Sequence, residues 1–196
     1  EMDLRTKNMA GFQLLDIQDY PGQGSAFVGI LDAFMESKGI TTPEEWRQWC
    51  SPVVPLAELD KFCFEDGEHV KAKIQVANYG GSSLKGKKLR WHLRAKKGAF
   101  RIDDGTYRTE EGEVKKNVGS LMTEDEGVLN IFSYDEGLMD VGELNGVFHV
   151  NKPTKLLLSL NIEGTEARNS YELWIYPKIQ LGANLANANF SANKKG

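Results

Sequence analysis

The chain has 196 residues, enough for one large or two small domains, and its 40% hydrophobic and 27% charged residues are ordinary for a globular protein. The formal net charge is −4, and the Lys and Arg residues are scattered, so we expect no nucleic-acid partner and no attraction to anionic membranes. The sequence contains no apolar run near the ~20 residues of a membrane span. No signal peptide is visible either.

Residues 1–10 look like the frayed end of a helix, and the stretch 11–39 reads GFQLLDIQDYPGQGSAFVGILDAFMESKG. It begins with an almost unbroken apolar run, residues 12–17, which predicts a strand buried on both faces, as in a parallel sheet. A polar, glycine-rich turn follows, and apolar residues then recur at helical spacing before Gly39. The stretch therefore predicts strand, loop and helix. Its strand finds no parallel partner in the next 40 residues, so we expect its neighbours to lie outside this sequence.

The next predicted element is a short helix that ends near Cys50. Thr42 is its N-cap, Pro43 its first residue and Glu45 completes a capping box. Two prolines shortly afterwards impose extended backbone and predict a linker. We place the domain boundary at Pro55, which gives residues 1–55 to the first unit.

From residue 59 the apolar period changes from helical to two, which predicts short strands with one buried face. The alternating segments are Val70–Val76, Leu89–Leu93, Leu156–Ile162 and Tyr171–Ile175, and the turn signals between strands are Asp66-Gly67, Asn78–Ser83, Asp104-Gly105 and Glu163-Gly164. Strands at this spacing without intervening helices predict an immunoglobulin-like antiparallel β-sandwich over residues 56–178, with Trp91 in its core. The fold class is thus mainly β.

Two further segments lack periodicity. Residues 109–145 are acidic and glycine-rich and are predicted to be a long excursion between strands, and residues 179–196 a linker or disordered tail. The two cysteines, Cys50 and Cys63, are too few for a disulfide scaffold and lack metal-ligand spacing. We expect two buried free thiols, and a mutual bridge is the alternative.

The segment GFQLLDIQDYPGQGSAFVGILDAF, continued by PEEWRQWCSPVVPL, resembles the last strand, loop and helix of the catalytic barrel in a β-galactosidase-like branch of glycoside hydrolase family 2. The resemblance is looser over the sandwich. It implies that residues 1–55 end a (β/α)8 barrel, that the sandwich buttresses it, and that the longer parent enzyme hydrolyses β-linked sugars with retention. It also implies an extracytoplasmic location, periplasmic or secreted.

The loop after the predicted strand carries the candidate substrate-binding residues Asp16, Gln18, Asp19, Tyr20 and Gln23. Carboxylates and amides can pair with sugar hydroxyls, and an aromatic ring can stack on a pyranose. The resemblance implies that the catalytic glutamates belong to two other barrel strands, so no residue of this chain is expected to be catalytic and the chain alone should be inactive. An equally open alternative is that the aspartates only satisfy loop amides and hold the end of the strand.

Two other sets of residues are weaker candidates for a binding site. Gly22, Gly24 and Gly29 superficially resemble a phosphate-binding turn, but Pro21 precedes the first of them and no second parallel strand follows, so we expect them to shape the loop. The histidines His69, His92 and His149 are widely separated, and we expect no metal and no cofactor.

A different class of function is a stand-alone sandwich that binds carbohydrate or protein. Trp174, Tyr176 and Tyr107 could form an aromatic platform for it, but both faces of the last strand are apolar. We therefore expect that strand to be central and covered, or packed against a neighbouring domain. The predicted barrel remnant exposes apolar residues and could also support self-association.

Overall fold

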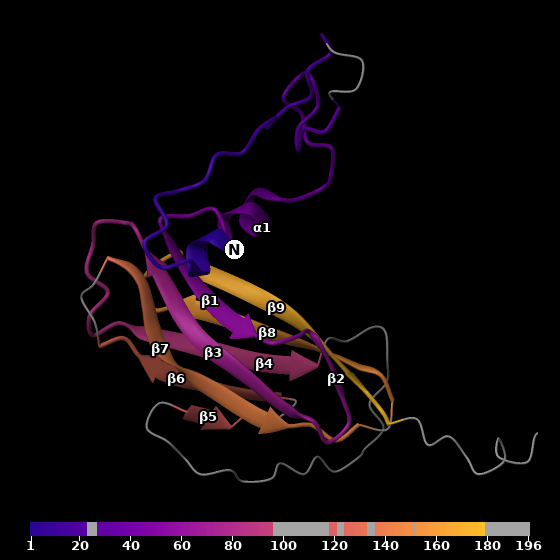
Figure 1. The fold of residues 1–196 in the computed structure, drawn as a ribbon, viewed down its shortest axis with the longest axis vertical. Coiled ribbons are helices and arrows are strands. Elements are labelled where there is room, and N and C mark those ends of the chain that lie inside the picture. The colour runs from indigo at the N-terminus through magenta and orange to yellow at the C-terminus, as the bar shows by residue number, and fades with distance from the viewer. Residues whose placement is uncertain (23–26, 96–117, 121–123, 133–135, 151, 179–196) are drawn as a thin grey trace, which may run out of the picture.

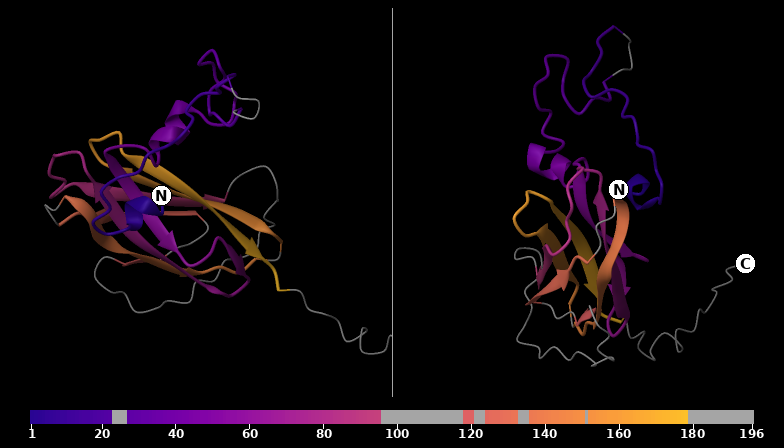
Figure 2. Two further views of the ribbon diagram at one scale, coloured as in Figure 1. Left: turned by 45° about the horizontal axis from the view of Figure 1, so that its top comes forward. Right: turned by 90° about the vertical axis from the view of Figure 1, so that its left-hand side faces the viewer.

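The computed structural model describes residues 1–22, 27–95, 118–120, 124–132, 136–150 and 152–178. Its strands form two sheets that face each other as a β-sandwich, and the N-terminal residues extend from one end of it (Figures 1 and 2). The four-stranded sheet has the order β1 (Val53–Leu59), β3 (His69–Asn78), β7 (Gly137–Val147) and β5 (Val118–Ser120). The five-stranded sheet has the order β2 (Cys63–Glu65), β9 (Arg168–Tyr176), β8 (Thr154–Ile162), β4 (Lys88–Ala95) and β6 (Glu124–Asn130).

The core lies between the inner faces of the two sheets. On β8 every second residue from Leu156 to Ile162 is buried. On β3 every second residue from Val70 to Val76 contributes the opposing face. Each such aliphatic side chain adds about 1.5–3 kcal/mol when fully buried. Trp91 on β4 is 4% exposed, and its indole covers Gly127 on β6, where a Cβ would lie 2.7 Å from the ring. The predicted core tryptophan is therefore confirmed, and it requires a glycine on the neighbouring strand.

The four strands predicted from alternation are confirmed as β3, β4, β8 and β9, and the chain is mainly β as predicted. The description of the sandwich as antiparallel is wrong in part. β2 pairs with β9 in parallel and β5 pairs with β7 in parallel, so each sheet is mixed. Both parallel pairs involve three-residue edge strands, which are too short to show a period in the sequence.

Two segments expected to lack strands contain them. β5, β6 and most of β7 lie within residues 109–145, where glycines and acidic residues hide the alternation. β7 is also irregular, because its register with β3 shifts at Ile74 and Gln75. Pro55, expected in a linker, lies inside β1 opposite Val76. Proline is tolerated there because β1 is an edge strand and needs no N–H on its open side.

The predicted strand over residues 12–17 and the predicted helix over 27–34 are not formed. Among the described residues of this region, β-type pairing is limited to two isolated bridges, Gln18 with Leu31 and Leu31 with Ser37. The physical reason is that a strand needs backbone partners on its flanks, and an amphipathic helix needs an apolar surface to cover. The short helix is confirmed as α1 (Pro43–Arg47), with the Thr42–Glu45 capping box in place.

The first ten residues are not a frayed helix end: they contain a short 3-10 helix, η1 (Asp3–Arg5), which docks on the sandwich. Leu4 packs against the small buried cluster of Val54, Leu56 and Ala77. Arg5 donates to the carbonyl of Ala57 at 2.5 Å. η1 thereby covers part of the open edge of β1, and covering an edge in this way limits pairing with other chains.

A buried polar cluster completes this contact. The amide of Asn169, 4% exposed, donates to the carbonyl of Pro55 at 3.0 Å and to the carboxylate of Glu1 at 2.8 Å. The Tyr171 hydroxyl donates to the same carboxylate at 3.1 Å. Burial, together with the nearby Glu1 charge, raises the pKa of Tyr171 well above its usual range, so the phenol remains a neutral donor.

The cysteines are free, as expected, but not buried: Cys50 is half-buried and Cys63 is exposed on β2. No helix in the described part of the chain is long and apolar enough to cross a membrane.

Replacing Asn169 by alanine should lower the free energy of unfolding by about 1–3 kcal/mol, because the buried Pro55 carbonyl loses its donor. Chemical denaturation measures this, with Asn161→Ala, an exposed position on neighbouring β8, as the matched control. Equal unfolding midpoints for the two variants would contradict the role assigned to the cluster.

Candidate functional site

The candidate loop belongs to an extension that we call the arm, residues 11–42, which projects from one end of the sandwich (Figures 1 and 2). The arm folds back on itself, so that residues 17–19 lie beside residues 29–31. The amides of Ile30 and Leu31 donate to the carbonyl of Ile17, and the amide of Asp19 donates to the carbonyl of Leu31. Backbone contacts, and not a regular element, therefore position the loop.

Asp19 and Lys38 join the two halves of the arm. Asp19 is 5% exposed, and its carboxylate oxygens lie 2.9 and 3.0 Å from the Lys38 ammonium. The same carboxylate accepts from the amide of Gly29 at 2.9 Å. Lys38 also donates to the carbonyls of Phe27 and Gly29, at 3.1 and 3.0 Å. Asp19 thus satisfies the Gly29 amide and the Lys38 cation, which is the structural role that the sequence left open.

The other candidates do not converge on Asp19. Asp16 is half-buried with a left-handed backbone (φ 61°), a conformation that aspartate tolerates. Gln18 forms the bridge to Leu31, and Tyr20 is 56% exposed. Gln23 lies outside the described residues. Gln18 and Asp19 therefore hold the two halves of the arm together, and Tyr20 lies at the surface of the arm.

The glycines shape the arm, as expected. A Cβ on Gly29 would lie 2.2 Å from the carbonyl carbon of Gln18, so only glycine permits the two halves to approach this closely. A Cβ on Gly22 would meet the Tyr20 ring at 2.5 Å. Gly24 lies outside the described residues.

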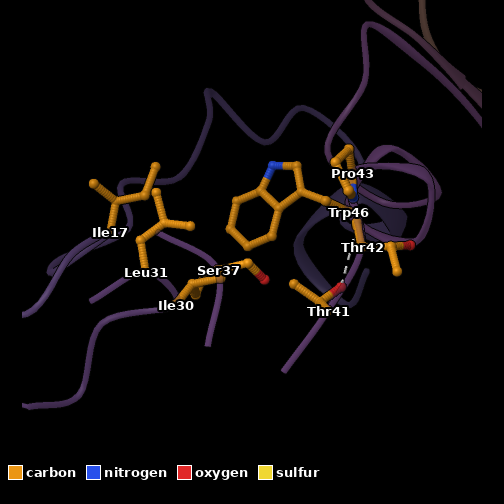
Figure 3. Close-up of a pocket in the computed structure, with 8 residues that line it drawn as sticks. All are labelled: Ile17, Ile30, Leu31, Ser37, Thr41, Thr42, Pro43 and Trp46. Carbon is orange, nitrogen blue, oxygen red and sulfur yellow. Dashed lines mark hydrogen bonds between the residues drawn. The ribbon is translucent and has the colours of Figure 1, made fainter. Parts of the chain in front are cut away.

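A small pocket lies between the arm and α1 (Figure 3). Its volume is about 210 Å³ and its lining is almost entirely apolar. The Trp46 indole forms one wall, and the full lining is Ile17, Ile30, Leu31, Ser37, Thr41, Thr42, Pro43 and Trp46. The lining contains no carboxylate, histidine or cysteine, so it provides no acid/base group and no base that could activate its serine and threonine hydroxyls.

Trp46 was not among the residues predicted from sequence. Its ring centroid lies 4.3 Å from that of Trp49, which in turn lies 6.3 Å from Phe12. The three-residue spacing of the two tryptophans on a predicted helix was the available signal, since residues i and i+3 share a helix face. Lys38 was also missed, because a single lysine near a glycine carries no pattern.

Two other sets of candidates lie in the sandwich. Within the described ranges no group of three or more His, Cys, Asp or Glu residues could hold a metal, and the histidines are exposed or half-buried. Trp174 and Tyr176 lie on the outer face of β9, and Tyr107 falls outside the described residues. β9 is central, between β2 and β8, but it is not fully covered, since Tyr176 is 43% exposed.

Replacing Asp19 by asparagine should loosen the arm while leaving the sandwich intact, because the Asp19–Lys38 ion pair holds arm residues only. Hydrogen exchange should show faster exchange at the amides of Gly29 and Leu31 and unchanged protection on β3 and β8. Asp16→Asn is the control. Protection at Gly29 and Leu31 equal to that of the unmodified chain would refute this role for Asp19.

A family model described as "Domain of unknown function (DUF8488)" matches residues 116–177, less than half of the chain. Comparison with curated proteins gives no match. Among solved structures, the cohesin module from a Clostridium perfringens family 33 glycoside hydrolase is 12% identical, with a TM-score of 0.36, over 63% of this chain and 96% of that one.

Two further structures are similar. Salmonella alpha-2-macroglobulin is 18% identical, with a TM-score of 0.37, over 70% of this chain and 8% of that one. A type II cohesin domain from the Acetivibrio cellulolyticus cellulosome is 11% identical, with a TM-score of 0.33, over 64% of this chain and 95% of that one. At these TM-scores the likenesses carry no argument about what the chain does.

Proposed function

We propose that this chain is the non-catalytic C-terminal portion of a longer, family 2-like glycoside hydrolase that acts on β-linked sugars. Residues 1–55 would supply the last strand and helix of its (β/α)8 barrel, and an immunoglobulin-like sandwich would buttress that barrel. One observation supports this most strongly, namely the exposed apolar surface of the arm.

Ten of the sixteen exposed large hydrophobic side chains among the described residues lie between positions 12 and 40. They are Phe12, Leu14, Leu15, Ile17, Tyr20, Phe27, Val28, Phe34, Met35 and Ile40. Single exposed apolar residues are normal, but a concentration of this kind marks a surface that another element covers. The arm is therefore suited to contact protein rather than water.

The pattern of the arm indicates what would cover it. Residues 12–17 have the continuous apolar character of a strand buried on both faces, and residues 27–34 have that of an amphipathic helix. Parallel neighbours would pair the free backbone of the first segment, and a sheet would bury the apolar face of the second. A barrel provides both, which agrees with the resemblance to the last barrel strand and helix.

In that setting the loop from Asp16 to Gln23 would follow the carboxyl end of a barrel strand, where barrel enzymes place their sites. Gln18, Tyr20 and Gln23 would then contact the sugar, and Asp19 would hold the loop. The catalytic glutamates would come from the remainder of the enzyme, and no cofactor is needed for hydrolysis with two carboxylates. The resemblance also favours an extracytoplasmic enzyme.

The purified 196-residue chain should not hydrolyse aryl β-glycosides, because the proposal places both catalytic carboxylates elsewhere. In the source organism, peptides of this chain should belong to a polypeptide several times larger than 21.9 kDa. Intact-mass measurement of the native protein tests this. A native mass near 21.9 kDa would refute the proposal and leave the stand-alone sandwich as the function to test.

The isolated chain should also self-associate through the arm and bind a hydrophobic dye, since the exposed apolar side chains have no cover. Leu15→Asp combined with Phe34→Asp, at positions 80% and 85% exposed, should reduce both effects. Phe132→Asp, at a 65% exposed position of the sandwich, is the matched control. Sedimentation of the unmodified chain as a monomer without dye binding would show that the arm is not an uncovered surface.

A further inference from the structure

The outer face of the five-stranded sheet carries an aromatic pair that the proposed barrel contact does not use. Trp174 and Tyr176 are two residues apart on β9 and point outward, since Leu173 and Ile175, which alternate with them along the strand, are buried in the core. Their ring centroids are 6.3 Å apart and their planes differ by only 21°. Tyr176 is 43% exposed and Trp174 is half-buried. The pair therefore presents a rigid aromatic surface.

Polar groups border these rings on both neighbouring strands. In the pairing of β8 with β9, Lys155 lies opposite Trp174, and its ammonium is 5.0 Å from the centroid of that ring. The same ammonium is 2.5 Å from a carboxylate oxygen of Glu172. On the other side, β2 places the exposed Glu65 beside Tyr176. Donors and acceptors thus surround an apolar surface.

Carboxylates offset the positive charge beside the rings. Lys155 pairs with Glu172, and Glu65 adds a second carboxylate beside Tyr176. A nucleic acid or an anionic lipid would need an excess of positive charge, which this surface does not offer. A neutral ligand with apolar faces and polar edges fits better, and a pyranose chain has this character, because C–H groups cover its faces and hydroxyls its rim.

The placement of the rings also favours recognition. β9 is hydrogen-bonded to β2 on one side and to β8 on the other, and Trp174 is held between Tyr176 and the Lys155 ammonium. Little side-chain freedom would be lost on binding, which favours affinity. We propose that Trp174, Tyr176, Lys155, Glu172 and Glu65 form a binding site for a neutral polysaccharide chain, independent of any sugar site in the proposed barrel.

The test is affinity electrophoresis of the full chain through gels that contain hydroxyethyl cellulose, xyloglucan or galactomannan, followed by titration calorimetry with any polysaccharide that retards it. Tyr176→Ala should weaken binding about tenfold through lost stacking, and Tyr176→Phe should retain most of it. Tyr79→Ala removes a similarly exposed ring elsewhere, 45% exposed, and should leave the affinity unchanged.

Circular dichroism of each variant separates lost binding from lost folding. An absence of retardation by all three polysaccharides would overturn the proposal, as would equal affinities of the Tyr176→Ala and Tyr79→Ala variants. Self-association abolished by Tyr176→Ala without retardation would also overturn it, by showing that this face joins two copies of the chain. The measurement needs no hydrolysis, so its outcome is separate from that of the proposed enzyme.

Discussion

The pairing of backbone N–H and C=O groups is the constraint on which this structure depends. A strand is stable when its flanks are paired and its apolar face is covered. β3, β4, β8 and β9 satisfy both conditions, each lying between two partners with its inner face in the common core. The arm satisfies neither, and its described apolar residues therefore remain in irregular chain, which backbone contacts and the Asp19–Lys38 ion pair hold together.

The same constraint explains how the N-terminus joins the sandwich. β1 is an edge strand, so the carbonyls of Pro55 and Ala57 have no strand beyond them. The Asn169 amide and the Arg5 guanidinium donate to these two carbonyls, and Glu1 links the two donors. A buried side-chain cluster thus substitutes for a missing strand. This anchor fixes the segment that precedes the arm to the well-packed sandwich.

The two surfaces proposed for binding differ in chemistry. The arm is broadly apolar and suited to burial against protein, whereas the outer face of β9 combines two rings with paired charges, as a surface for a soluble polar ligand does. The glycoside hydrolase that we propose would use both, the first to complete its barrel and the second to hold a chain of its substrate. The pocket beside Trp46 belongs with the arm, since its apolar lining has no group that would orient a sugar.

Local pattern determined much of the sandwich. Alternation over β3, β4, β8 and β9 specified which residues enter the core, and the Thr42–Glu45 capping box specified α1, because both signals act within a few residues. Other features depended on contacts distant in sequence. Pro55 could join a strand only because β1 lies at an edge. The need for glycine at position 127 follows only from its contact with the Trp91 ring. In the candidate site, the sequence identified Asp19 but not Lys38, its partner across the arm. The strand and helix predicted over residues 12–34 did not form, because periodicity describes what a segment would bury, and only tertiary structure decides whether anything is there to bury it against.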